Sequence, residues 1–254
     1  MLDAITFDLW DTLIRETPES ARKVTEARIR GLYMLLQSQG YAGTVEEVGA
    51  AYDEVGERLG GIWSRNEDVG AEGQVKLFLE ALDHGCELSP DPMALANMEW
   101  AYVSPALQAL PVLNQGAAEL MAEMGKRYRL GLICNTGRTP GTMLKIILQR
   151  LGILEHFDVL TFSDVVGLRK PDPQIFQVTL DGLSVPANRA LHVGDNPSTD
   201  IQGARRMGMR AVLLGSPEAA PPDDGGVWTI EALGELPRIL EQLERQGGKA
   251  GVQS

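Results

Sequence analysis

The chain has 254 residues, which is enough for one large domain or for a core with a modest second domain. Its formal net charge of −12 argues against nucleic acids and anionic membranes as partners, because both require a basic protein surface. Hydrophobic residues make up 44% of the chain and aromatic residues only 6%, a balance that suits an α/β protein with an aliphatic core. An anionic substrate would be repelled at long range, so its binding site must supply local positive charge.

The first residues, Met1 to Ala4, include neither basic residues nor a long apolar run, so no signal peptide is expected. No stretch reaches the length that crosses a bilayer. The two cysteines, Cys86 and Cys134, are expected to be free thiols in a reducing compartment. We therefore expect a soluble cytoplasmic protein, monomeric or homodimeric, whose partner is a small-molecule substrate.

The first predicted element is a buried strand over residues 4–9, an apolar run that places Asp8 at its carboxyl end. The pattern then changes over residues 15–105, where apolar side chains recur at intervals of three and four. Helices are predicted from about residue 22 to residue 36, from Thr44 to about Leu59, and over 71–84 and 91–104. A capping box opens the second helix at Thr44, and Gly60-Gly61 is expected to end it. No strand is expected in this segment.

After Pro111 strands and helices alternate. Strands are predicted over 128–134, 157–162, 190–194 and 210–214, and helices over 115–127, 141–151, 172–183, 200–207 and 229–244. Such alternation predicts a parallel sheet with right-handed crossovers, an α/β fold of the Rossmann-like kind. We therefore expect residues 1–14 and 106–244 to form the core, 15–105 an all-helical cap, 215–227 a loop and 245–254 a flexible tail.

Polar side chains follow the predicted core strands, and in an open α/β sheet ligands bind at the carboxyl ends of the strands. In chain order these side chains are Asp8, Asp11, Cys134, Asn135, Thr136, Arg138, Lys170, Asp195 and Asp200. A carboxylate can attack phosphorus, and neighbouring carboxylates can share Mg²⁺, which also screens an incoming phosphate. A lysine can hold the nucleophile and the phosphoryl oxygens together.

Four segments carry a family resemblance: Phe7-Asp8-Leu9-Trp10-Asp11-Thr12-Leu13, Cys134-Asn135-Thr136-Gly137, Lys170-Pro171-Asp172-Pro173, and Gly194-Asp195-Asn196-Pro197-Ser198-Thr199-Asp200. In this order they resemble the four motifs of the haloacid dehalogenase-like (HAD) superfamily, and the helical segment lies where its subfamily I places a C1-type cap. Most such proteins are phosphatases of small metabolites.

The resemblance implies a role for each motif. Asp8 would be the nucleophile that forms an aspartyl-phosphate, and Lys170 would stabilise the phosphoryl group. Asp8, Asp195 and the backbone carbonyl of Trp10 would bind Mg²⁺, with Asp200 supporting directly or through water. Phosphate or substrate would be bound by Trp10, Asp11, Cys134, Asn135, Thr136 and Arg138.

Two positions depart from the phosphatase pattern. Trp10 replaces the usual aspartate that protonates the leaving oxygen, and Asp11, one residue further on, is not expected to substitute fully. Cys134 replaces the usual serine or threonine, and a thiol is a poorer donor. Thr136 or the backbone N–H of Asn135 could take over its role.

The aromatic residue at position 10 leaves alternatives open. The dehalogenase branch also lacks an acid there, although its fourth motif differs from Gly194-Asp195-Asn196. The phosphonate-cleaving branch requires a lysine in the cap, but neither Lys23 nor Lys76 has a matching context. A third alternative is a binding or regulatory protein that retained the fold and lost activity.

Other polar residues are given structural roles. His192 is expected to pack in the core. Arg22, Arg28 and Arg30 are expected on a solvated helix face, from which one could reach the cleft. Substrate specificity is expected to come from the cap and from residues 215–227.

Overall fold

The computed structural model describes residues 2–82, 90–216 and 226–250. Its centre is a six-stranded sheet with the strand order β5-β4-β1-β6-β7-β8, in which every neighbouring pair is parallel. The strands are β1 (Ala4–Phe7), β4 (Arg129–Cys134), β5 (Val159–Phe162), β6 (Ala190–Gly194), β7 (Arg210–Leu214) and β8 (Val227–Ile230). The predicted Rossmann-like α/β fold is confirmed.

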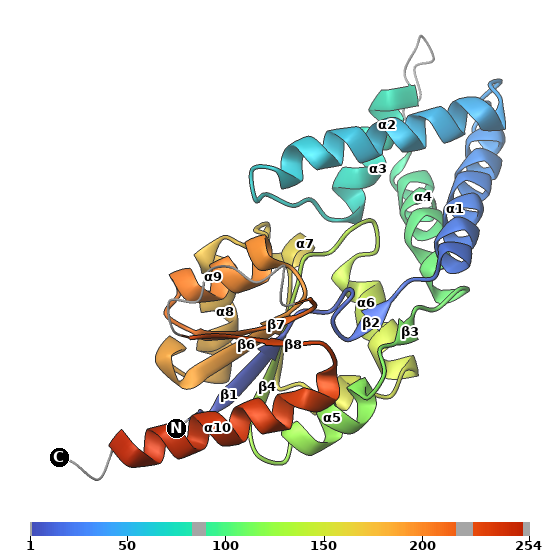
Figure 1. Cartoon of the computed structure of the whole chain (residues 1–254). Coiled ribbons are helices and arrows are strands. Elements are labelled where there is room, and N and C mark those ends of the chain that lie inside the picture. The colour runs from blue at the N-terminus through green and yellow to red at the C-terminus, as the bar shows by residue number, and fades with distance from the viewer. Residues whose placement is uncertain (1, 83–89, 217–225, 251–254) are drawn as a thin grey trace.

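Helices cover both faces of the sheet (Figure 1). One hydrophobic cluster joins the sheet to α5 (Ala117–Met124), α6 (Gly141–Arg150) and α10 (Leu236–Ala250), and another joins it to α8 (Pro173–Leu183) and α9 (Gln202–Arg206). Short helical elements connect them: η1 (Ser104–Leu107), η2 (Leu154–His156), α7 (Ser163–Val166), η3 (Ala187–Arg189), the π-helical turn η4 (Pro197–Ile201) and η6 (Leu233–Glu235). All four residues of β1 are buried, so the first strand is the centre of the core.

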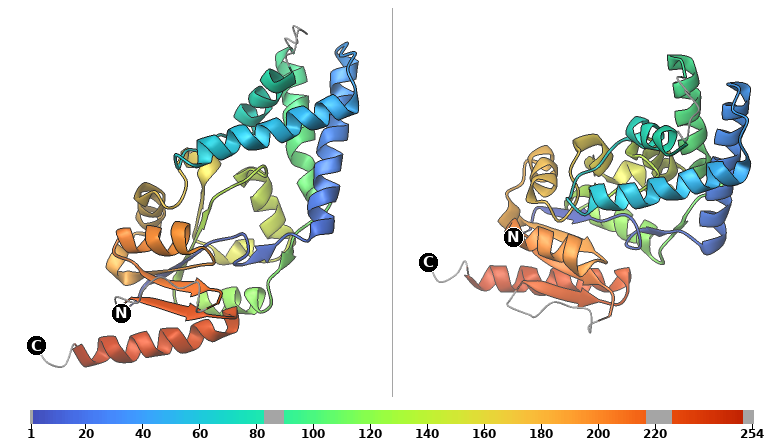
Figure 2. Two further views of the ribbon diagram at one scale, coloured as in Figure 1. Left: turned by 45° about the horizontal axis from the view of Figure 1, so that its top comes forward. Right: turned by 90° about the horizontal axis from the view of Figure 1, so that it is seen from above.

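Four helices are inserted between β1 and the rest of the core: α1 (Pro18–Ser38), α2 (Val45–Trp63), α3 (Ala71–Leu82) and α4 (Pro92–Val103). They stand together on one side of the sheet (Figure 2) and share a separate hydrophobic cluster that includes Leu32, Val55, Phe78 and Tyr102. The chain enters this segment through β2 (Ile14–Arg15) and leaves it through β3 (Val112–Leu113), which pair antiparallel. None of the described helices is long and apolar enough to span a membrane.

Local signals explain where two of these helices begin. Thr17 and Thr44 cap α1 and α2 with reciprocal side-chain hydrogen bonds, the second as predicted. The predicted end of α2 at Gly60-Gly61 is wrong, because the helix continues to Trp63. Two glycines weaken a helix but do not stop it when its hydrogen bonds continue, and Ser64 N–H donates to the carbonyl of Gly60.

The C-terminal prediction also needs correction. Residues 227–230 form the edge strand β8, where a loop and the start of a helix were expected, and the terminal helix begins only at Leu236. It extends to Ala250, beyond the expected start of a flexible tail at residue 245. The first strand ends at Phe7 rather than at residue 9, and the helix predicted from residue 200 begins as η4. Cys86, His84 and most of the predicted loop 215–227 lie outside the described residues.

Candidate active site

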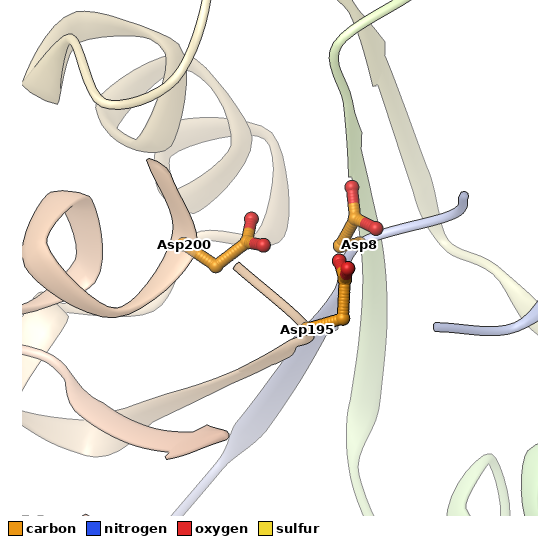
Figure 3. A group of neighbouring side chains, drawn as sticks. All are labelled: Asp8, Asp195 and Asp200. Atoms are coloured by element: carbon orange, nitrogen blue, oxygen red, sulfur yellow. The ribbon is translucent and has the colours of Figure 1, made fainter. Parts of the chain in front are cut away.

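Three carboxylates meet at the carboxyl ends of the central strands. Asp8 directly follows β1, Asp195 directly follows β6, and Asp200 lies in η4. One oxygen from each lies within 4.8 Å of the others, so the three could hold a metal ion (Figure 3). Gly194 permits this arrangement, because a Cβ at that position would lie 2.4 Å from Cγ of Asp200.

Lys170 is a buried cation between two of these carboxylates. Its Nζ lies 2.5 Å from Oδ1 of Asp8 and 2.7 Å from Oδ1 of Asp200, and its side chain is 1% exposed. Each carboxylate therefore compensates for the loss of water around the ammonium group. The structure brings Lys170 to Asp8, as the motif order implies.

Asp200 is held on every side by protein groups. Besides Lys170, its Oδ1 contacts Nε2 of His192 at 3.3 Å, and its Oδ2 accepts from the backbone N–H of Asn196 at 3.0 Å. Nδ1 of His192 in turn contacts the hydroxyl of Thr6 at 2.8 Å. His192 is fully buried and packs edge-on against Phe176, as a core histidine should, but it also orients a carboxylate of the site.

The protonation equilibria reflect crowded charges. Burial raises the pKa of Asp8 to about 7, although Lys170 opposes the shift. Burial, with the charges of Asp200 and Asp11, raises the pKa of Asp195 to about 6. Burial would also raise the pKa of Asp200, but Lys170 and His192 outweigh it and the pKa is lowered. Burial disfavours the charge of Lys170, yet Asp200 and Asp8 raise its pKa. Asp8 and Asp195 are thus the two carboxylates that gain most from an added cation.

The turn after β4 separates the roles of three motif residues. Cys134 is fully buried, and burial raises the pKa of its thiol well above the usual value. The side chain of Asn135 binds the backbone of Lys170 twice, accepting from its N–H at 2.8 Å and donating to its carbonyl at 3.0 Å. The amide of Thr136 donates to Ser163 Oγ at 2.8 Å, so neither it nor the buried thiol is placed to receive a ligand.

A cavity of about 690 Å³ lies between the inserted helices and the sheet. Trp10, Asp11, Asn135 and Arg138 line it from the core, together with residues of α1 and α2. Of the three arginines on α1, Arg28 lines the cavity. Its guanidinium group donates to the carbonyl of Tyr102, to the hydroxyls of Tyr52 and Thr139, and to the carbonyl of Arg138.

Arg138 lies over the ring of Tyr52, with Cζ 3.8 Å from the ring centre. Arg138 was predicted to bind phosphate or substrate, and in the structure it forms part of the cavity wall. Asp11 has a positive φ of 58°, which turns it away from the direction that a residue in an extended strand would take.

Other candidates lie elsewhere. Lys23 and Lys76 pair with Glu19 and Glu72 on exposed helix faces. Two residues near the site were missed by sequence reasoning, Asp68 and Ser163, which contact the turn after β4. Ser163 could have been found because it directly follows a predicted strand, whereas Asp68 lies in the helical insert without a local signal.

Comparison with known proteins agrees with this geometry. A family model described as haloacid dehalogenase-like hydrolase matches residues 2–208. The glyceraldehyde 3-phosphate phosphatase of Methanopyrus kandleri is 29% identical over 98% of this chain and 100% of its own. A protein of the same name from Methanothermobacter thermautotrophicus is 30% identical (85% of this chain, 87% of its own). The phosphoserine phosphatase of Thermus thermophilus is 28% identical (85% and 92%).

Solved structures show the same fold. The 2-haloacid dehalogenase of Pseudomonas syringae superposes with a TM-score of 0.67 at 24% identity, covering 96% of this chain and all of its own. The HAD phosphatase of Thermococcus onnurineus gives a TM-score of 0.60 at 22% identity, covering 94% and 98%. The chain belongs to the haloacid dehalogenase-like hydrolase family and is a hydrolase.

Proposed function

We propose that the protein is a magnesium-dependent phosphatase of a small phosphorylated metabolite. The observation that carries the proposal is the buried pair of Asp8 and Lys170, 2.5 Å apart, with the carboxylate of Asp195 beside it. A nucleophile, a fixed cation and a second carboxylate are what phosphoryl transfer through an aspartyl-phosphate requires. The phosphatase names of the curated relatives support the same reaction class.

The residues present fit Mg²⁺. Asp8 and Asp195 offer hard oxygen ligands, and burial together with neighbouring carboxylates raises the pKa values of both, so a bound cation would stabilise their charged forms. We propose that these two and the backbone carbonyl of Trp10 hold the ion. Asp200 already accepts from Lys170 and from the backbone of Asn196, so we propose that it reaches the metal through water. The ion would neutralise charge on the phosphoryl oxygens.

Pairing of Oδ1 with Lys170 leaves Oδ2 of Asp8 as the attacking oxygen. Oδ2 forms a bond to phosphorus while the bond from phosphorus to the leaving oxygen breaks, and the electron pair stays on that oxygen. Water then attacks phosphorus and the bond to Oδ2 breaks, which restores the free carboxylate and releases inorganic phosphate that carries both protons of the water molecule as dihydrogen phosphate. Lys170 contacts the phosphoryl oxygens throughout. Because Thr136 is engaged, the backbone N–H of Asn135 is our candidate for a further donor.

Trp10 limits the choice of leaving group. An indole has no acidic group that could protonate a departing alkoxide, and loss of a general acid costs about a hundred- to ten-thousand-fold. Esters whose leaving groups are stable without a proton, such as phenols, enols and acyl groups, lose less. We therefore propose a substrate of this kind.

The cavity sets the size of the substrate. We propose that residues 15–105 act as a cap over a core of residues 1–14 and 106–244, and that the cavity of about 690 Å³ between them encloses the substrate. Arg138 and Arg28 supply positive charge in a chain that is otherwise acidic. This local positive charge would offset the repulsion between an anionic substrate and the net negative charge of the chain.

The dehalogenase alternative accounts for the absence of an acid at Trp10, but it assigns no role to the carboxylate of Asp195. Halide departs without a proton, yet two adjacent carboxylates with no cation between them would repel each other. Release of halide from 2-haloacids that is indifferent to a chelator would favour that alternative over ours.

The test is phosphate release from an aryl phosphate by the purified protein. We expect Mg²⁺-dependent turnover that a chelator abolishes and that Asp8→Asn removes. The matched control is Asp3→Asn, at the other end of β1, which removes the charge of a surface ion pair with Arg189. If the Asp8→Asn variant retained the rate of the wild type, or no phosphate ester in a broad panel were turned over, the proposal would be wrong.

A further inference from the structure

The loop between α2 and α3, residues 64–70, is fastened to the core by one buried carboxylate. Asp68 has a side chain that is fully buried, and it pairs with Arg169 at 2.6 Å from Nη1 to Oδ2. The guanidinium group also lies over the ring of Trp63, whose Nε1 donates to Oδ1 of Asp68 at 3.0 Å. A carboxylate from the inserted helices is thus enclosed by a cation and a ring.

Two core hydroxyls complete the enclosure. Ser163 donates to Oδ2 of Asp68 at 2.5 Å, and Thr136 donates to the same oxygen at 3.2 Å. The backbone N–H of Val69 donates to Oδ1 at 2.8 Å. Both carboxylate oxygens therefore have several partners, which offsets the cost of burying the charge.

Backbone contacts hold the same two segments side by side. The N–H of Arg169 donates to the carbonyl of Asn66 at 2.8 Å, and the N–H of Asp68 donates to the carbonyl of Gly167 at 3.2 Å. Glu67 and Leu168 lie between them as an antiparallel bridge. The loop of the insert and the segment before Lys170 thus form one hydrogen-bonded unit.

Both core partners of Asp68 adjoin residues of the catalytic site. Arg169 precedes Lys170, and its Nη1 also donates to the carbonyl of Thr136 at 2.5 Å. Thr136 follows Asn135, whose side chain binds the backbone of Lys170. The contacts of Asp68 therefore reach Lys170 by two routes, one along the chain through Arg169 and one through the turn after β4.

We propose that Asp68 is a positioning residue, which couples docking of the helical insert to the placement of Lys170 against Asp8. The proposal rests on the proposed phosphatase function. With Asp68 in place, the turn after β4 and the segment before Lys170 are clamped together, and the ammonium group is held at the nucleophile. When the insert undocks, the clamp opens and Lys170 loses its placement.

The first test compares Asp68→Asn with Glu67→Gln. The control removes a neighbouring charge whose one ion pair among the described residues is with exposed Arg65. Displacement of a catalytic group by about 1 Å costs about a hundredfold in rate, so we expect kcat of Asp68→Asn to fall by about ten- to a hundredfold. KM should change little, because Asp68 does not line the cavity. Glu67→Gln should match the wild type in both constants.

Hydrogen exchange supplies a measurement that needs no activity. The amide of Thr136 is bonded to Ser163 and the amide of Lys170 to Asn135, so exchange of both reports the clamp. We expect faster exchange at both in Asp68→Asn, with exchange in β7 unchanged. If the wild type turned over no phosphate ester, the proposed function would fail while this measurement would still decide the role of Asp68.

Ser163→Ala is a milder variant in case Asp68→Asn does not fold. It removes one donor to Asp68 and the acceptor of the Thr136 amide, but leaves the Arg169 pair in place. A smaller fall in kcat, again without a change in KM, is expected. Wild-type kcat in folded protein together with a lowered melting temperature would show that Asp68 is merely structural. Wild-type exchange at Lys170 in Asp68→Asn would equally overturn the coupling.

Discussion

The ammonium group of Lys170 lies 2.7 Å from Oδ1 of Asp200 and 2.5 Å from Oδ1 of Asp8, so Asp200 holds the cation that contacts the proposed nucleophile. His192 and the backbone of Asn196 occupy the rest of this carboxylate. Asp200 therefore contributes to the site mainly by orienting Lys170.

This arrangement predicts different effects for two acidic residues. Asp200→Asn should lower kcat by about ten- to a hundredfold, the usual cost of losing a group that orients a ligand, with a small change in the Mg²⁺ concentration at half-maximal rate. Asp195→Asn should raise that concentration strongly. Titration of activity with Mg²⁺ distinguishes them, and an equal shift in both variants would contradict the assigned roles.

The contact between His192 and Thr6 predicts that substitutions at the two positions are coupled in their effect on the free energy of unfolding. In the wild type, Thr6→Val leaves Nδ1 of His192 without its partner at 2.8 Å and should destabilise the fold by about 1–3 kcal/mol. In the His192→Phe background the hydroxyl of Thr6 keeps only its long contact with the carbonyl of Leu191, at 3.5 Å, so the same change should cost much less stability. Urea unfolding of the four proteins measures both effects, and equal destabilisation in the two backgrounds would exclude the coupling.

The pKa of Asp195 predicts how stability depends on pH without metal. Burial, with the charges of Asp200 and Asp11, raises this pKa from 3.8 to about 6, so the folded chain binds more protons than the unfolded chain between these values. The wild type should therefore lose stability relative to Asp195→Asn as the pH rises through that window, with a constant difference above it. Melting temperatures at several pH values test this.

Added Mg²⁺ should narrow the difference in melting temperature between the wild type and Asp195→Asn, because the ion binds the folded wild type more tightly than the folded variant. If the difference in melting temperature between the wild type and Asp195→Asn shrank as the pH rose, the result would contradict a raised pKa of Asp195. A difference unaffected by Mg²⁺ would mean that Asp195 does not bind the ion.

Trp10→Asp should restore the missing proton donor. We expect the rate on alkyl phosphates to rise more than the rate on aryl phosphates, because only the alkoxide needs a proton in order to leave. Trp10→Phe is the control, since it retains an aromatic side chain without an acid. A pair of variants with the same ratio of alkyl to aryl rates would show that the absent acid does not limit turnover.

Much of the core was predictable because its signals are local. The apolar runs that end at Asp8 and Asp195 specify buried strands, and parallel strands bring their carboxyl ends together. Hence the contact of Lys170 with Asp8, between residues 162 positions apart, follows from the order of the elements. The family and the hydrolase class follow from the same motifs.

The remaining features depend on tertiary contacts that have no local pattern. β8 pairs with β7 alone at the edge of the sheet, and its four residues give too short a period to distinguish from a loop. Trp63, beyond two glycines, is helical and packs against Arg169 and Asp68. Asp68 contacts residues up to 101 positions away, so its partners could not be inferred from its neighbours.

The paired strands β2 and β3 place the exit and the return of the inserted helices next to each other, with Ile14 opposite Leu113. Because the inserted segment leaves and re-enters the core at adjacent strands, a change in its length need not displace the strands of the core. Residues can be gained or lost between these strands, or a different insert exchanged for this one, while the register of the six-stranded sheet stays fixed. The paired strands thus isolate the register of the sheet from the length of the insert, while the ion pair of Asp68 with Arg169 still ties the insert to the segment that carries Lys170.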